Sequence, residues 1–487
     1  MKRFQLLHPS FAWSTRLLML WALLAGTTGL QAQRILTLDS CLHMAMSNNK
    51  QLGAAKIKQE MSKNLRKSAR TKYLPHVNMV GGYLFSSKEV SILSDQQKQH
   101  FSNLGSNMQH YMNSMGGSIG GLEAILNAEG AGIVDGFHTN TRHIFAGSVM
   151  ATMPLYMGGS ITAMNKMADL GEEMAANSTE AVRQNTLYDT EQAYWMVVSL
   201  RNKQRLAESY LALIKKLNGD VQKMIAEGVA TRSEGLSVEV KQNEAEMTLL
   251  QVNDGLTLAK MMLCQLCGIP VNENIELEDE KSDKTTNTTL TLTTDLNSTA
   301  ENTWHTMRPE LRMLQNTIDM GHQTTRMAKA GYLPKVMLTG SYSMTNPNVY
   351  NGFQREFAGI WNIGVLVCVP VFNWGDVTYK VRASKNATAM AQMELDEARE
   401  KVDLQVSQST FKVSEAEKKL ALAKTSCKRA EENLRCANIG FREGVMQSTT
   451  VMEAQTAWLQ AHSQKIDAEI ELILSHTNLK KAKGILQ

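Results

Sequence analysis

Proline and aromatic residues are scarce in this chain. It has 487 residues, of which 8 are proline and 6% are aromatic. The segments 155–269 and 371–487 contain no proline and are rich in Ala, Leu, Met, Glu, Lys and Gln. Because a proline inside a helix costs about 3 kcal/mol, such segments favour very long helices. A compact enzyme built from short elements fits this composition poorly.

Catalytic and cofactor-binding motifs are also missing. The sequence has no HExxH, GxSxG, P-loop or dinucleotide-binding pattern. Its 11 histidines show no metal-ligand spacing, and its acidic residues are scattered through the helical segments. We therefore expect no enzyme activity, no cofactor and no metal centre.

A large excess of one charge is absent too. The chain has 51 Lys and Arg against 47 Asp and Glu. Residues 1–32 resemble a secretory signal peptide, with Lys2, Arg3 and Arg16 ahead of the apolar run 17–24 and a small-residue cleavage pattern at 30–32. The alternative, an uncleaved anchor, conflicts with a run shorter than the roughly 20 residues that a membrane span needs. Removing the three cations leaves 48 basic and 47 acidic residues, so nucleic-acid binding has no electrostatic support.

The six cysteines do not form a dense disulfide framework. Cys264 and Cys267 could share a helix face as a bridge or a metal pair. Ordinary packing is the favoured interpretation, because no second CxxC or histidine pair completes a zinc site. Cys427 and Cys436 are half a turn out of phase on a helix and should not bond to each other.

The chain contains an internal repeat. The sequence Tyr-Leu-Pro at residues 73–75 recurs at 332–334, an offset of 259. The segment Met-Pro-Leu-Tyr at 153–156 corresponds to Val-Pro-Val-Phe at 369–372, and Glu-Gly-Val at 227–229 recurs at 443–445, both with an offset of 216. A segment of unchanged length predicts one continuous rigid element, and the 43-residue change in offset must fall in a tolerant loop.

Each half is predicted to run strand, loop, strand, long helix, turn and shorter helix. Apolar residues alternate in four segments, which we expect to be strands at about 76–86, 143–153, 335–345 and 360–369. Alternation alone also fits a soluble half-buried sheet. Four strands with an apolar face cannot close a membrane barrel by themselves, because open sheet edges are not tolerated in lipid. Three copies would supply twelve strands, an even number within the known range.

The loop between the first two strands, residues 87–142, is rich in glycine and has no charged residue from Phe101 to Leu122. This composition suits a surface loop with little fixed structure. The chain also has 30 methionines, and Met108, Met112 and Met115 in this loop raise the alternative of a copper or silver exporter, since thioethers select soft ions. Methionine is more often a pliable core residue, so metal export is the weaker reading.

The helical segments carry heptad patterns. Apolar residues follow a 3-4 spacing along the last quarter of the chain, with alanine at every second position: Val413, Ala416, Leu420, Ala423, Cys427, Ala430, Leu434 and Ala437. The first repeat has the matching set, interrupted by the polar Gln204 and Asn218. Such heptads predict supercoiled packing, in which Cys427 is a seam residue. A helix of about 65 residues would extend about 100 Å, which suits a structure crossing an aqueous compartment.

These features resemble the TolC family of bacterial outer membrane efflux proteins. The resemblance rests on the order and duplication of motifs across the mature chain, including the opening residues 36–42 and Arg-Pro-Glu-Leu at 308–311. It implies a mainly α fold with membrane β-structure, a homotrimer sharing one twelve-stranded barrel in outer membrane lipid, and a helical tunnel in the periplasm. The prolines at the starts and ends of the strands are Pro75, Pro154, Pro334 and Pro370.

The resemblance further divides the chain into a signal peptide at 1–32, a first repeat at 33–282 with its helical hairpin at 158–268, a Thr-rich linker at 283–299, and a second repeat at 300–487 with its hairpin at 375–484. It implies a passive duct docked through a periplasmic adaptor onto an inner-membrane transporter of the resistance-nodulation-division or ATP-driven type. The periplasmic tip and entrance would be marked by Gly228, Glu234, Ser237, Gly444, Thr450 and Glu453.

Family members ring this entrance with acids just after the second-repeat glycine, and here the matching positions hold Thr450 and Glu453, so one acid is missing. A cation-selective ring at Glu453 is one interpretation, and a solvated helix face is the other. An extended coiled-coil adhesin or envelope scaffold is the alternative function. It would explain the heptads but not the paired strands.

Overall fold

The computed structural model describes residues 34–89, 91–138, 140–280, 304–350 and 354–486. The predicted signal peptide and the Thr-rich linker lie outside these residues. The chain divides into two units: the first comprises residues 1–59, 174–314 and 394–487, and the second comprises 60–173 and 315–393. None of the helices in the described part is both long and apolar enough to span a membrane.

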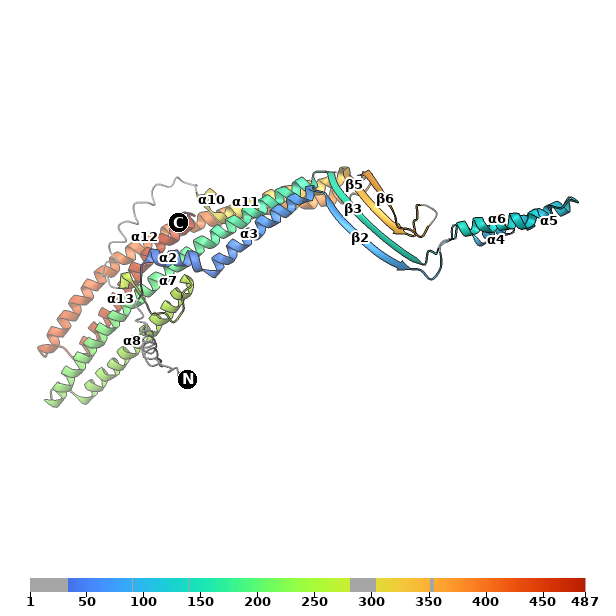
Figure 1. The fold of residues 1–487 in the computed structure, drawn as a ribbon. Coiled ribbons are helices and arrows are strands. Elements are labelled where there is room, and N and C mark those ends of the chain that lie inside the picture. Colours follow the sequence, from blue (N-terminus) through green and yellow to red (C-terminus); the bar gives the residue numbers. More distant parts are fainter. Residues whose placement is uncertain (1–33, 90, 139, 281–303, 351–353, 487) are drawn as a thin grey trace, which may run out of the picture. The chain divides into compact units, whose positions relative to one another are not determined.

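The second unit contains a four-stranded antiparallel sheet (Figure 1). Its strands, in the order β2-β3-β5-β6, are β2 (His76–Phe85), β3 (His143–Met157), β5 (Lys335–Asn346) and β6 (Ala358–Cys368). β2 and β6 are therefore the two edge strands. β-Branched, aromatic and small residues dominate all four strands, as a pleated and closely packed surface requires.

The register places the alternating apolar residues of all four strands on one face. Residues directly opposite each other share a face, and one such row runs Met79, Val149, Tyr342 and Trp361. The neighbouring row on the other face runs Asn78, Met150, Ser341 and Asn362. The sheet thus has one apolar face and one face of mixed polarity.

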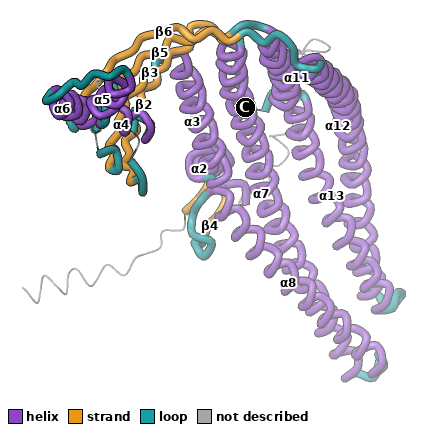
Figure 2. Tube along the Cα trace, turned by 90° about the vertical axis from the view of Figure 1, so that its right-hand side faces the viewer, coloured by secondary structure: helices purple, strands orange, loops and turns teal. Residues whose placement is uncertain are grey.

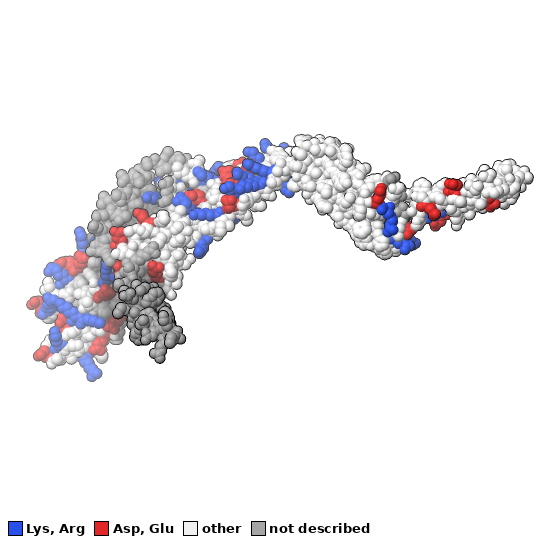
Figure 3. Space-filling model, in the orientation of Figure 1, with Lys and Arg blue, Asp and Glu red and all other residues white. Residues whose placement is uncertain are grey.

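Charged residues are nearly absent from the sheet. Lys335 is the only Lys, Arg, Asp or Glu in the four strands. On the face shown in Figure 3 the area of the strands is correspondingly almost free of charge, whereas the helical segments carry both signs. The apolar residues stay exposed in the single chain, including Met79, Tyr83, Trp361 and Ile363.

The residues between β2 and β3 fold into helices, so the prediction of a loop with little fixed structure was wrong. They form α4 (Asp95–Ser102), α5 (Leu104–Ser114) and α6 (Leu122–Gly136). Two glycines allow close packing: a Cβ at Gly105 would lie 2.1 Å from the carbonyl oxygen of Glu123, and one at Gly130 would lie 1.8 Å from that of Phe101. Two of the glycines that suggested a loop are therefore helix-packing positions.

The first unit is helical (Figure 2). It contains α2 (Leu38–Asn48) and the greater part of two hairpins, each with a long helix followed by a shorter one: α7 (Ser160–Ala226) with α8 (Arg232–Cys267), and α12 (Asp376–Arg442) with α13 (Ser448–Ala482). α7 and α12 each have 67 residues and occupy the proline-free segments. Two further helices, α3 (Lys50–Arg70) and α11 (Pro309–Lys329), precede β2 and β5, and the sequence analysis did not anticipate them.

Most of the heptad positions of α7 and α12 are buried. In α12, Ala416, Leu420, Ala423, Cys427, Leu434 and Ala437 are buried, and the Cys427 thiol donates to the carbonyl oxygen of Ala461 over 3.1 Å. The polar interruptions in α7 reach α8. Gln204 donates to Asn253 over 2.7 Å and Asn218 donates to Gln242 over 2.9 Å.

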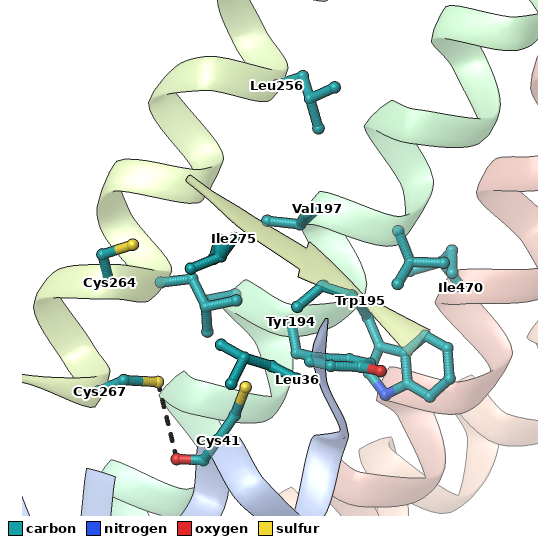
Figure 4. Packing of buried hydrophobic residues seen from close by; sticks show 14 of the residues in the cluster. Leu36, Cys41, Tyr194, Trp195, Val197, Leu256, Cys264, Cys267, Ile275 and Ile470 are labelled. Atoms are coloured by element: carbon teal, nitrogen blue, oxygen red, sulfur yellow. Dashed lines mark hydrogen bonds between the residues drawn. The ribbon is translucent and has the colours of Figure 1, made fainter. Parts of the chain in front are cut away.

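A large core joins segments that are distant in the sequence (Figure 4). The two three-residue strands β1 (Arg34–Leu36) and β4 (Ile275–Leu277) pair in parallel beside α7 and α8. Cys264 and Cys267 are buried here without forming a disulfide, and the Cys267 thiol donates to the carbonyl oxygen of Cys41 over 3.7 Å. The structure therefore confirms the favoured interpretation, in which these two cysteines pack in the core.

Candidate functional site

One glycine turn connects the two helices of each hairpin. Gly228 has φ 74° and Gly444 has φ 75°, a left-handed conformation that glycine adopts without a steric penalty. In each turn the next residue closes the helix end: Val229 N–H donates to the carbonyl of Met224, and Val445 N–H to that of Gly440, both over 2.8 Å. The two turns therefore have the same hydrogen-bonding pattern.

The helix starts that follow these turns differ. In the first, Thr231 accepts from the N–H of Glu234 over 3.3 Å, and the Glu234 carboxylate accepts from the N–H of Thr231 over 2.9 Å. In this capping box the Glu234 carboxylate helps to cap the start of α8. In the second repeat Gln447 and Thr450 stand at these positions, and Gln447 makes no side-chain cap. Glu234 is thus a capping residue rather than a free acid.

Ser237 and Glu453 are brought together in a groove between α8 and α13. The groove has a volume of about 500 Å³ and is lined by Ser237, Val240, Lys241, Glu244, Thr449, Met452, Glu453, Thr456, Ala457 and Gln460. The other predicted tip residues, Gly228, Glu234, Gly444 and Thr450, do not line it. The offset of 216 makes Ser237 and Glu453 equivalent positions, so the groove lies between matching faces of the two repeats.

Two acidic residues line this groove, Glu244 and Glu453, and their surroundings differ. The Glu453 side chain is exposed and has no hydrogen bond or ion pair within the described residues. Glu244, by contrast, accepts from Lys241 over 2.8 Å, and this hydrogen bond raises the pKa of Lys241. The sequence analysis did not single out the Lys241–Glu244 pair, although its i, i+3 spacing is a usual signal for a helical ion pair.

A core beneath the turns holds these side chains in place. It consists of residues from all four helices, namely Leu217, Val221, Val238, Leu434, Ala437, Val451 and Ala454. Val238 and Val451 are completely buried, next to Ser237 and two residues before Glu453. The groove is therefore built on a packed framework and not on loops.

A second paired feature lies where strands meet helices in the second unit. The Tyr73 hydroxyl donates to the Thr162 hydroxyl over 3.0 Å, and Tyr332 and Thr378 share a hydrogen bond of 2.7 Å. Pro75 and Pro334 stand between these tyrosines and the first residues of β2 and β5. The repeated Tyr-Leu-Pro segment thus connects each strand start to the first turn of a 67-residue helix.

The prolines at the strand ends are not equivalent. We expected a strand at about 143–153, but β3 continues past Pro154 to Met157, and its pairing with β5 shifts register between Pro154 and Tyr156. A proline has no N–H to donate, so the ladder is interrupted by a bulge instead of ending. Pro370 follows β6, which ends at Cys368.

Metal-binding geometry is absent from the part of the chain that the structure describes. No group of three or more His, Cys, Asp or Glu side chains could hold a metal ion there. Of the three methionines in this segment, Met108 and Met115 are exposed, whereas Met112 is partly buried and lies beside Gly117. Metal export through these methionines therefore stays a hypothesis from the sequence alone.

Comparisons with known proteins identify the family. The sequence matches the family described as outer membrane efflux protein over residues 41–268 and 305–484. It is 25% identical over 171 residues to the outer membrane protein TolC of Vibrio cholerae, covering 34% of this chain and 39% of that protein. It is 21% identical over 301 residues to the outer membrane efflux protein BepC of Brucella suis, covering 62% of this chain and 63% of that protein. The chain thus spans less than two thirds of either relative.

The fold agrees with this assignment. The structure matches the CmeC outer membrane channel of Campylobacter jejuni with a TM-score of 0.72 at 14% identity, over 92% of this chain and 85% of that chain. At such low identity the likeness concerns the fold alone. The family match covers most of both halves and is to outer membrane efflux proteins, not to an enzyme family. The chain belongs to the outer membrane efflux protein family and is an outer membrane protein.

Proposed function

We propose that this protein is a passive exit duct, which carries substrates from an inner-membrane transporter through the outer membrane. The observation that carries the proposal is the four-stranded sheet, with one apolar face and two edge strands, β2 and β6. Unpaired strand edges are not tolerated in lipid, so the sheet needs copies of itself to close. Three copies supply twelve strands, and a homotrimer with one shared barrel follows.

The ends of the sheet support a position across a membrane. Aromatic rings gather at one end, where Tyr83 lies 4.9 Å from Phe145 and Phe145 lies 6.4 Å from Phe357 between ring centroids. Beyond the other end of β6, Phe372 and Trp374 are exposed and lie 4.8 Å apart. Aromatic residues at both interfaces are typical of membrane barrels.

Exposed apolar stripes on two helices support subunit packing. α8 exposes large apolar side chains on the side opposite its buried residues Val238, Ala245 and Leu256; the exposed residues are Leu236, Val240, Met247, Leu250, Leu258 and Met261. α12 has a comparable stripe of Met390, Met393, Leu404, Phe411 and Leu422. In a trimer these stripes would face helices of the neighbouring subunits and complete a coiled-coil tunnel.

The order of strands and helices along the chain supports an orientation with the long helices on the periplasmic side. The long helices begin at one end of the sheet, after Met157 and Cys368, and α4–α6 are connected at the opposite end, between Phe85 and His143. If the helices cross the periplasm, α4–α6 lie outside the cell. The turns at Gly228 and Gly444 then form the periplasmic tip, where a periplasmic adaptor and an inner-membrane transporter of the resistance-nodulation-division or ATP-driven type would dock.

The proposed domain organisation follows the repeat. Residues 33–282 and 300–487 form the two repeats, which are joined by the linker at 283–299 and preceded by a signal peptide at 1–32. Each repeat contributes two strands and one helical hairpin. An extended adhesin or scaffold explains the helical stripes, but it gives no reason for the apolar sheet face.

Glu453 is proposed to form an acidic ring at the entrance of the trimer. Its free, exposed carboxylate and its position after the second turn support this role. Three copies near the axis would attract cations, so Glu453→Gln should lower the ratio of cation to anion permeability. Glu244→Gln is the matched control, because Glu244 lies in the same groove but is paired with Lys241. An unchanged ratio in Glu453→Gln would rule out the ring.

The test of the duct is conductance of the purified mature protein in a planar bilayer, together with its native mass in detergent. We expect a trimer and discrete single-channel steps. A soluble oligomer that does not insert would refute the barrel and leave the scaffold as the better account.

A further inference from the structure

The hairpin of α4, α5 and α6 is a folded unit with its own polar network. The Asn127 side chain accepts from the N–H of Gly105 over 2.8 Å and donates to the Ser106 hydroxyl over 2.8 Å. The same hydroxyl donates to Glu123 over 2.9 Å. With the close contacts at Gly105 and Gly130, these bonds hold α6 antiparallel to α4 and α5. The side chains that face outward are therefore fixed in position.

One side of this hairpin is apolar. Met108 and Tyr111 follow one face of α5, Met115 follows the last residue of this helix, and Leu122 and Ile125 lie on α6; all five are more than half exposed. The helix contact passes through Gly105 and Glu123, and the exposed residues lie about 60° to 160° from it, on the same side of both helices. We call these five residues the hairpin face. The opposite side carries His110, Asn113 and Ala128.

The hairpin face has no partner within the described chain, and it forms a large exposed apolar patch. Its five side chains expose roughly 500 Å², at the upper end of what one patch on a monomeric soluble protein exposes. No Lys, Arg, Asp or Glu occurs from Phe101 to Leu122, so this segment has no charge that could pair with a charged partner. Glu129 marks the end of the apolar region on α6, nearer to the strands.

The composition of the hairpin argues against burial in a membrane surface. Amphipathic helices that lie on membranes are rich in Lys and Arg on their polar side. Between Glu89 and His138, Lys98 is the only Lys or Arg. Identical uncharged faces, by contrast, meet without electrostatic repulsion.

Copies of the chain would be brought together by the barrel itself. The hairpin is attached to β2, an edge strand, and to its neighbour β3, so closure of the barrel places three hairpins on one rim. Strands about 4.8 Å apart and tilted by about 45° give twelve strands a rim radius of about 13 Å. α6 has 15 residues and is about 22 Å long, enough to reach the central axis.

We propose that the three hairpins pack against one another through the hairpin face and form a helical bundle at the outer mouth of the duct. This inference rests on the proposed trimeric barrel. It assigns the apolar face to a second and third copy of this chain, and it gives the outer mouth a built structure where the sequence suggested only a loop.

Cysteine crosslinking tests the contact. The background is Cys368→Ser with Cys436→Ser, because these two cysteines are exposed and the other four are buried. Met108→Cys then places a thiol on the hairpin face, and His110→Cys is the matched control, about 200° around the same helix. After mild oxidation we expect at least about tenfold more disulfide-linked dimer from Met108→Cys, since packed neighbours have millimolar effective concentrations. The yield should not depend on protein concentration.

Native mass measured on each variant separates the two proposals. A trimer in which Met108→Cys gives no more dimer than His110→Cys overturns the bundle and leaves the duct standing. A yield that rises with protein concentration also overturns it, since the contact would then join separate trimers. Protection of Met108→Cys from a water-soluble maleimide in outer membrane vesicles, without crosslinking, would assign the face to lipid instead. A monomer overturns both the bundle and the trimeric duct.

Discussion

The buried carboxylate of Glu280 is predicted to hold the small β1–β4 sheet against α7 and α8. Its side chain is 3% exposed and lies 3.4 Å from Lys260 Nζ and 3.6 Å from Arg201 Nε. It also accepts from the N–H of Leu277 over 3.2 Å, at the end of β4. Three groups on different segments therefore depend on one carboxylate.

Glu280→Ala leaves two cations and a buried N–H without this acceptor. Removal of one member of a buried ion pair costs about 3–5 kcal/mol. We expect the lower end of that range, because the side chains of Lys260 and Arg201 are 21% and 35% exposed and can turn toward water. Glu280→Gln keeps an acceptor for Leu277 and should cost about 1.5 kcal/mol, in the range of a hydrogen bond to a charged group.

Hydrogen exchange followed by mass spectrometry measures this loss locally, without requiring reversible unfolding of a membrane protein. A cost of about 3 kcal/mol corresponds to roughly 100-fold faster exchange of the β1 and β4 amides in Glu280→Ala, and about 1.5 kcal/mol to roughly tenfold in Glu280→Gln. The amides of β3 and β5 serve as the internal control. Less than about threefold acceleration in Glu280→Ala would refute the reasoning, as would equal effects of the two substitutions.

Three further predictions concern the turns and a buried histidine. Gly444→Ala should lower stability by about 1 kcal/mol through its positive φ alone, since no atom lies within 4 Å of the added Cβ. Gly219→Ala in the interior of α7 should raise stability by a similar amount. Thermal melting compares the two variants, and equal shifts in melting temperature would contradict the role of backbone conformation. Gln447→Ser should supply the missing cap of α13 and slow exchange in its first turn, with a gain of about 1 kcal/mol, and Thr231→Ala should speed exchange in α8 by a matching loss. Burial lowers the pKa of His476, which neighbours Glu417 and Lys480 and whose ring nitrogens have no hydrogen bond in the described structure. The unfolded state therefore takes up the proton first, so stability should fall as pH drops below about 6.5. The substitution His476→Leu should abolish that part of the pH dependence of the melting temperature.

The sequence by itself determined the periodic elements. Alternation over ten or more residues identified the apolar sheet face, and the register pairs Met79 with Val149 and Tyr342 with Trp361 as that alternation requires. The heptads likewise identified the buried sides of α7 and α12. Periodic burial leaves a signal in sequence because every turn or every second residue repeats the same environment.

Only the tertiary structure decided the features that depend on distant residues. β1 and β4 have three residues each, too few to show a period, and their pairing joins segments about 240 residues apart. In the sequence, the glycines of α5 and α6 suggested a loop. The structure shows that Gly105 and Gly130 instead allow the opposing backbone to approach closely. Glu234 and Glu453 both lie in the first turns of the helix that follows a glycine turn, and only the hydrogen bonds around them distinguish a helix cap from an unpaired carboxylate. Local pattern therefore sets the elements, and the contacts between them set what each residue does.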